Sequence, residues 1–206
     1  YAKSKSVSKL LDMRRFDFTK QLPTHCSDKY EKEYFLIFAI FVAGKNAKVA
    51  TEKTWELMKW IRRDETPFTY LKEVIKDDDL LSVHLKRIKV GQYARIEKAL
   101  KDIINLNVET CTLDDLLACH GVGNKTARFF LLNTRKDAEY AVLDTHVLKW
   151  LNSLFGNWMS VPKSTPTSGS RYALWEYKAI QAMKKEYPER TLAQADFEIW
   201  KTFAKV

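Results

Sequence analysis

Two glycines, Gly121 and Gly123, lie one residue apart between two stretches that have the apolar pattern of helices. The chain has only six glycines in 206 residues, so a closely spaced pair marks a place where the backbone must turn. Glycine allows the positive φ angles that a tight turn needs. The pattern predicts a helix that ends near Cys119, a short hairpin, and a second helix that begins near Asn124.

The other segments also have helical periodicity. After Gly91, for example, Ile96, Leu100 and Ile103 fall on one face of a helix. No clear alternating pattern of a β-strand occurs, although residues 138–144 could form a short extended link. The sequence therefore predicts an all-α fold. Helical patterns cover residues 30–44, 46–63, 92–106, 124–133, 145–155, 170–187 and 191–205.

Three positions have the chemistry of a helix start. Asn46 is a good N-cap residue, because its side-chain oxygen can accept from a free backbone N–H. Thr66 precedes Pro67, a pairing that suits an N-cap followed by the first helical residue. Thr112 and Asp115 have the spacing of a capping box, with Asp in place of the usual Glu. These positions predict where three of the helices begin.

Composition narrows the class of protein. Hydrophobic residues make up 46% of the chain, which is ample for a buried core. The net charge is +9, and a basic surface suits a polyanionic partner such as a nucleic acid. The longest apolar run, from Tyr34 to Gly44, is shorter than the roughly 20 residues of a membrane-spanning helix. We therefore expect no membrane association.

The cysteines indicate a reducing compartment. Cys26, Cys111 and Cys119 are odd in number and share no CxxC spacing, so they are expected to be reduced thiols. The first residues also lack the apolar stretch of a signal peptide. We expect a cytoplasmic protein, associated with the nucleoid if the source is a prokaryote.

The hairpin itself has a candidate function. Gly121, Val122 and Gly123 would expose bare backbone, and the first N–H groups of the next helix lack intrahelical acceptors. Such a concave set of donors suits a phosphate oxygen and can hold a nucleic-acid backbone without reading its sequence. A plain corner between two helices is the alternative interpretation of the same residues.

Lys125 and the VLDTHVLKWL stretch extend the pattern. Together, residues 116–151 resemble the helix–hairpin–helix DNA glycosylase superfamily, which has L-x-G-[VI]-G-x-K-[TV]-A followed by [VI]-D-[TVR]-H. The hairpin glycines, Lys125, Asp144 and His146 agree with that motif in order and spacing. His120 departs from it, because the family usually has proline there. The resemblance implies an all-α fold of two helical lobes, with residues 30–136 in one lobe and residues 1–29 and 137–206 in the other.

The resemblance also implies a reaction. A DNA glycosylase turns a damaged nucleotide out of the duplex and breaks its bond to the sugar. Lys125 would attack as a neutral amine and form a Schiff base, which permits strand cleavage by β-elimination. Asp144 would stabilise the positive charge of the transition state. The open alternatives are a solvated surface lysine at 125 and a helix N-cap at 144, and Asp144 could serve both as cap and as catalytic group.

Further residues have roles by resemblance only. His146 stands where the family often has a side chain that contacts phosphate, although a packed histidine in the first helical turn would have the same position. Lys45 and Asn46 stand where the family inserts a polar residue into the gap left by the everted base. They could equally belong to a solvated face.

Two aromatic residues are candidates for the base pocket. Phe129 follows Lys125 by four residues, so both would project from one face of a helix. The C-terminal DFEIWKTFAKV is similar to the tail of small 8-oxoguanine glycosylases of the archaeal type, which implies that Trp200 packs on the base, with Lys205 and Val206 close by. An ordinary core position for Trp200 is the alternative.

The predicted function is that of a bifunctional DNA glycosylase and abasic-site lyase in base excision repair. The substrate would be an oxidised base in double-stranded DNA, with 8-oxoguanine favoured, and the protein would act as a monomer. An oxidised-pyrimidine glycosylase and a non-catalytic helix–hairpin–helix DNA-binding module are the alternatives. No cysteine follows Cys119, which excludes the four-cysteine iron–sulfur cluster of some relatives. No metal or other cofactor is expected, apart from a monovalent cation that the hairpin could hold.

Overall fold

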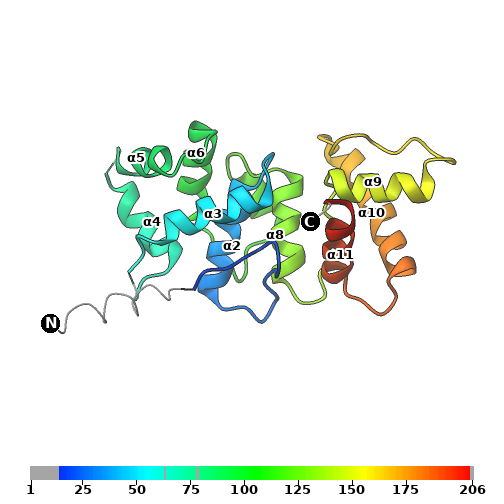
Figure 1. Cartoon of the computed structure of the whole chain (residues 1–206), viewed down its shortest axis with the longest axis horizontal. Helices are drawn as coiled ribbons and strands as arrows, with labels where there is room; N and C mark the ends of the chain where they lie inside the picture. The colour runs from blue at the N-terminus through cyan, green and yellow to red at the C-terminus, as the bar shows by residue number, and fades with distance from the viewer. Residues whose placement is uncertain (1–13, 63, 78, 205–206) are drawn as a thin grey trace. The chain divides into compact units, whose positions relative to one another are not determined.

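A computed structural model of the chain describes residues 14–62, 64–77 and 79–204 (Figure 1). Helices are the regular secondary structure of this part of the chain, and no strand occurs in it, so the predicted all-α class is confirmed. The helices are α2 (Lys29–Phe41), α3 (Ala47–Met58), α4 (Pro67–Ile75), α5 (Leu80–Arg87), α6 (Tyr93–Ile103), α7 (Leu113–Ala118), α8 (Asn124–Thr134), α9 (Thr145–Phe155), α10 (Gly169–Glu186) and α11 (Leu192–Ala204).

The predicted helix starts are confirmed. The Asn46 side chain accepts from two backbone N–H groups at the beginning of α3. Thr66 caps α4, and Pro67 is the first residue of that helix. In a capping box, the Asp115 carboxylate accepts from the Thr112 backbone N–H, and the Thr112 hydroxyl accepts from the Asp115 backbone N–H. Sequence reasoning missed α5, which begins without a side-chain cap bond.

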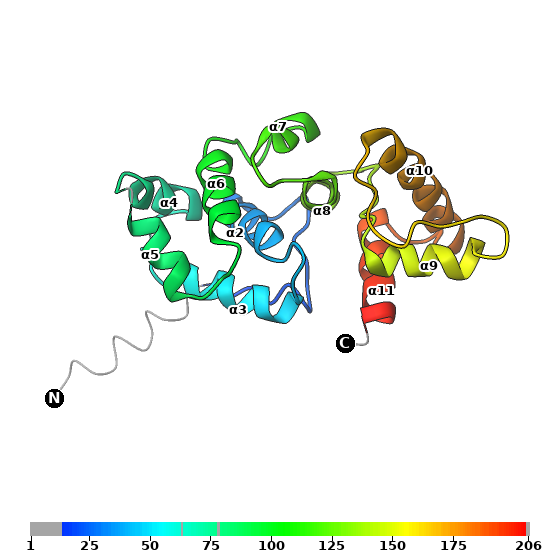
Figure 2. The same cartoon turned by 90° about the horizontal axis from the view of Figure 1, so that it is seen from above.

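The described residues divide into two compact units, and the first contains those within residues 14–23, 27–111 and 119–121. Its central element is α2, in which every residue from Lys32 to Phe41 is buried. Figure 2 shows α3 and α6 beside α2, and α4 also packs on it. The apolar run that is too short for a membrane helix is therefore the core helix of this unit.

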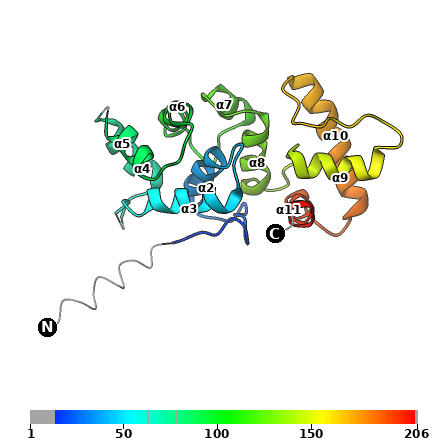
Figure 3. The same cartoon turned by 45° about the horizontal axis from the view of Figure 1, so that its top comes forward.

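The second unit contains residues 24–26, 112–118 and 122–204. Within it, α11 packs on α8, α9 and α10, and α7 packs on α8. Figure 3 shows α9 next to α10, with α11 seen end-on. Its core is built from the apolar faces of α9, α10 and α11 together with the extended residues 141–143.

These units differ from the predicted lobes. Residues 122–136 belong with the C-terminal helices because α8 packs on α7 and α11. The N-terminal residues belong with α2 instead, because the rings of Phe16 and Phe18 pack on Tyr34. As a result, Lys125 and Asp144 lie in the same unit and not in two different lobes.

Candidate active site

The hairpin has two glycines with different backbone requirements. Gly121 has a φ of 71°, in the left-handed region that favours glycine, whereas Gly123 is extended and forms the N-cap of α8. Arg95 holds the first part of the hairpin: its guanidinium donates to the Gly121 carbonyl at 3.1 Å and to the Ile40 carbonyl at 2.9 Å. The Asp102 carboxylate accepts from the backbone N–H of His120, the residue before Gly121.

Lys125 is the second residue of α8 and is half-buried. No side chain caps this helix at Gly123, so the first backbone N–H groups of α8 have neither a side-chain cap nor intrahelical acceptors. The positive end of the helix dipole lies at the same place. The start of α8 therefore has the electrostatic properties of an anion site, and Lys125 belongs to this first turn.

The extended link before Asp144 is held at each backbone polar group from Ala141 to Leu143. Tyr172 of α10 accepts from the Leu143 N–H at 3.0 Å and donates to the Ala141 carbonyl at 3.1 Å. Glu176, one turn further along α10, accepts from the Ala141 N–H at 3.1 Å. Thr165 donates to the Leu143 carbonyl at 2.7 Å. Buried backbone groups must be paired, and here the pairing fixes the chain immediately before Asp144.

Thr165 gives the loop between α9 and α10 a role that the sequence did not reveal. The loop, drawn in yellow, runs back along α9 toward the start of α10 (Figure 2). Its Thr165 hydroxyl is a donor for the link that precedes Asp144. The loop thus contributes to positioning this carboxylate.

Asp144 is the N-cap of α9. Its Oδ1 accepts from the backbone N–H groups of His146 and Val147, each at 2.8 Å. Two such bonds, at the positive end of a helix dipole, fix the side chain and suit a negative charge. The side chain is half-buried, so it is oriented by the protein yet reachable. The predicted N-cap at Asp144 is confirmed, and its catalytic role stays a prediction.

A buried ion pair connects α8, the helix of Lys125, to α10. Arg128 lies three residues after Lys125, and its Nε donates to Glu176 at 2.8 Å. The same guanidinium donates to Asn124 at 2.7 Å and lies over the Tyr172 ring, 4.5 Å from its centroid. One carboxylate, Glu176, thus anchors both the helix of Lys125 and the link to Asp144.

Sequence reasoning missed a third charged residue of this region. Asp196 of α11 is only 6% exposed. Burial raises the pKa of its carboxyl well above the usual value, and the negative charge of Asp144 raises this pKa further. The Lys125 charge and a hydrogen bond from the Val142 N–H oppose that rise. The sequence did hold a signal, because Asp196 is an acid beside the apolar stripe of the last helix.

The charges of Lys125 and Asp144 both act on the Asp196 carboxyl, so these three residues belong to one region of the second unit. The three residues come from three elements: the start of α8, the N-cap of α9 and the second turn of α11. All of them belong to the second unit.

The predicted aromatic residues lie in the same unit. Trp200 is half-buried and follows Asp196 by one helical turn, with its ring parallel to that of Phe197 at 5.9 Å between centroids. His146 meets the Trp200 ring edge to face, with 6.5 Å between centroids. Phe129 packs against the core of the unit. Trp200 is thus not an ordinary core residue, and its contact with a base stays a prediction.

Lys45 and Asn46 lie in the first unit. Asn46 caps α3, and the Lys45 amine donates to the Val90 carbonyl. Desolvation lowers the Lys45 pKa, and the nearby Arg95 charge lowers it further. These contacts give both residues a structural role, and their predicted insertion into DNA stays a prediction. Lys205 and Val206 lie outside the described residues.

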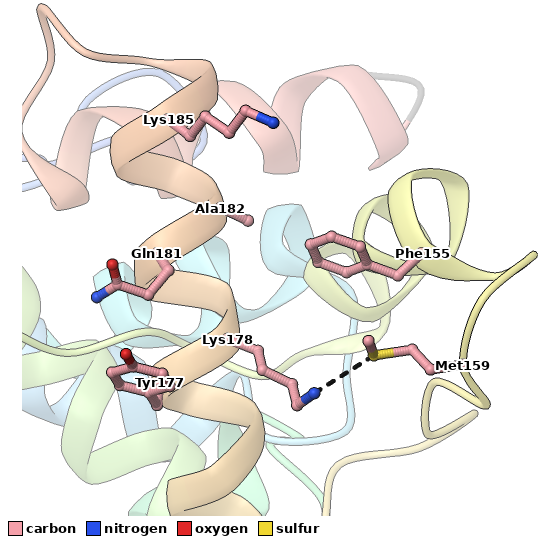
Figure 4. Close-up of a pocket in the computed structure, with 7 residues that line it drawn as sticks. All are labelled: Phe155, Met159, Tyr177, Lys178, Gln181, Ala182 and Lys185. Atoms are coloured by element: carbon pink, nitrogen blue, oxygen red, sulfur yellow. Dashed lines mark hydrogen bonds between the residues drawn. The ribbon is translucent and has the colours of Figure 1, made fainter.

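Another hollow of the second unit lies away from these residues. Figure 4 shows it between α10 and the end of α9, where Phe155, Met159 and Ala182 form an apolar floor beside Lys178. None of the predicted site residues lines it. Among the residues that the structure describes, no cluster of three metal-ligating side chains occurs, and no helix is both long and apolar enough to cross a membrane.

Comparison with known proteins bears on the fold. No family model matches the chain, and no curated protein matches it in sequence. The structure is similar to that of the 8-oxoguanine glycosylase/lyase of Methanocaldococcus jannaschii, crystallised with a 15mer DNA that contains 8-oxoguanine. The TM-score is 0.64 at 18% identity, over 100% of this chain and 93% of the other. The chain therefore has the helical fold of that glycosylase.

Proposed function

We propose that the protein is a DNA glycosylase with lyase activity that removes an oxidised base, 8-oxoguanine in the first instance. The observation that carries the proposal is the placement of Lys125 and Asp144 in one unit, where both charges act on Asp196. An amine nucleophile and a carboxylate close together are what displacement at the anomeric carbon of a deoxyribose needs.

In the proposed reaction, the neutral Lys125 amine attacks this sugar carbon while the bond to the damaged base breaks. The transition state has positive charge on the sugar ring, and Asp144 stabilises that charge. Two backbone N–H groups bind the Asp144 carboxylate, and hydrogen bonds fix the extended residues 141–143 before it. The carboxylate therefore needs little reorganisation during the reaction. The resulting Schiff base on Lys125 then permits β-elimination and strand cleavage.

The substrate class is inferred from the fold and from the aromatic residues. The similar archaeal enzyme is an 8-oxoguanine glycosylase/lyase and was crystallised with DNA that contains this lesion. Trp200, one turn from Asp196, offers a half-buried ring on which an everted base could stack. Damaged double-stranded DNA is therefore the proposed partner, and the net charge of +9 suits it.

A non-catalytic DNA-binding module is the second candidate, because Asp144 has a complete structural role as an N-cap. Borohydride trapping separates the two, since only an amine that forms a Schiff base becomes covalently linked to DNA. We expect the wild-type protein to be trapped on a duplex with 8-oxoguanine, and Lys125→Ala to abolish trapping. Lys136→Ala, an exposed lysine of the same unit, is the matched control.

Asp144→Asn tests the carboxylate alone, because asparagine is as good an N-cap as aspartate and keeps both bonds to α9. We expect excision to slow by about a hundredfold or more, with an unchanged midpoint of thermal unfolding. Trapping of Lys125→Ala at the wild-type rate would contradict the proposed reaction. Wild-type protein that binds the duplex but is never trapped would support the non-catalytic module.

A further inference from the structure

Asp196 has an unusual environment for an ionisable residue. It is 6% exposed, and its Oδ1 is buried without a hydrogen-bond partner in the described part of the chain. One backbone donor, the Val142 N–H, binds the carboxyl. Leaving a buried polar atom without a partner is unfavourable, so a carboxyl in this state requires an explanation.

The groups around Asp196 come from every element packed against α11. The charges of Lys125 on α8 and of Asp144 at the N-cap of α9 act on its carboxyl, and the charge of Asp196 in turn acts on Tyr172 of α10. The Tyr172 hydroxyl already donates to the Ala141 carbonyl, so it does not donate to Asp196. His146 of α9 also has a buried Nδ1 without a partner among the described residues. In its protonated form, Lys125 is thus the cation whose charge reaches Asp196.

The two carboxyl groups of the site have opposite environments. Asp144 is half-buried, accepts two N–H bonds and lies at the positive end of a helix. Asp196 is buried, with one donor and an unpaired oxygen, and its pKa is raised by burial and by the neighbouring Asp144. Two carboxyls whose surroundings differ in this way commonly divide into a carboxylate and a neutral acid. A neutral acid next to a nucleophile can donate its proton to a leaving group.

We propose that Asp196 is the general acid of the excision step and donates its carboxyl proton to the departing base. The inference rests on the proposed function, because it needs Lys125 as the nucleophile. The base leaves with the electrons of its bond to the sugar, and the Asp196 O–H proton passes to the base nitrogen. The new bond between Lys125 and the sugar leaves two protons on a cationic nitrogen. One of them returns to the Asp196 carboxylate, which restores the neutral acid.

The test compares two substrates in single-turnover experiments: a duplex with 8-oxoguanine and a duplex with a preformed abasic site. Asp196→Asn keeps the shape of the side chain but has no acidic proton. We expect it to slow excision by about a hundredfold or more, the usual contribution of a general acid. Cleavage at the preformed abasic site should slow by less than tenfold, because no base remains to be protonated.

A purely structural role would slow both reactions by the same factor, and that result would overturn the proposal. Asp137→Asn is the matched control, since Asp137 is exposed and its φ of 53° suits asparagine. DNA affinity and thermal unfolding of both variants show whether they are folded. If the wild type neither excises nor is trapped, the proposed function itself fails.

The pH profile of the wild type provides a second measurement that needs no variant. Excision should decline on the alkaline side, as the general acid loses its proton, whereas cleavage of the preformed abasic site should lack this decline. Identical profiles for the two substrates would refute the assignment even if Asp196→Asn did not fold.

Discussion

Gly121→Ala should destabilise the protein, whereas Gly123→Ala should not. An L-residue at the φ of 71° found at Gly121 costs about 1–2 kcal/mol. A Cβ there would also lie 2.9 Å from Cγ of Arg95, so this side chain would have to move. Losing one of the Arg95 bonds costs about 1.5 kcal/mol, the low end for a charged donor, because Arg95 is only half-buried. The total is about 3 kcal/mol.

Gly123 is a matched position with the opposite expectation. Its backbone is extended, and nothing lies within 4 Å of a Cβ built on it. Alanine is a poorer N-cap than glycine, but it also lowers the entropy of the unfolded chain, so the two effects nearly cancel. The free energy of unfolding should change by less than about 1 kcal/mol. If the hairpin holds a phosphate, however, the added methyl would occupy that space and weaken DNA binding by about tenfold, the equivalent of one hydrogen bond.

Urea unfolding and a DNA titration at one salt concentration check both expectations. Equal stability losses in the two variants would refute the conformational argument. If Gly123→Ala bound DNA as tightly as the wild type, the hairpin would not hold a phosphate. The predicted difference in stability between the two variants would not depend on that result.

Two further predictions concern charges inside the second unit. Arg128→Met should lower the free energy of unfolding, measured by urea titration, by about 3–5 kcal/mol, because Glu176 would remain buried without its cation. Lys184→Met, at the exposed pair with Glu139, should lower it by less than about 1 kcal/mol. Comparable losses would mean that the Arg128 pair contributes no more than a surface one. The pKa of Asp196 is higher in the folded protein than in the unfolded chain, so protonation of its carboxyl favours folding. This contribution to stability is complete below about pH 4, the pKa of the unfolded chain, and it is lost as the pH rises toward the folded pKa. The urea midpoint of Asp196→Asn should therefore increase relative to that of the wild type as the pH rises. A difference between the two midpoints that stays constant with pH would show that Asp196 does not titrate as inferred.

Local sequence patterns predicted the local structure of this protein well. Asn46, Thr66 and the Thr112–Asp115 box marked helix starts, because a cap depends only on residues within one turn. Helical periodicity gave the all-α class for the same reason. The glycine pair indicated the hairpin, and the sequence predicted Asp144 as an N-cap, which its bonds to α9 confirm.

Tertiary packing decided which segments belong together, and here sequence reasoning was less successful. It placed Lys125 and Asp144 in different lobes, because nothing local shows that Arg128 reaches Glu176, 48 positions away. It also passed over Asp196, whose burial beside Lys125 and Asp144 arises only when α11 packs on α8 and α9. The sequence by itself predicted most of the helices, several of their caps and the two residues of the proposed reaction. Only the packed structure decided the electrostatic surroundings of those residues, because desolvation and charge proximity depend on segments that are distant in sequence.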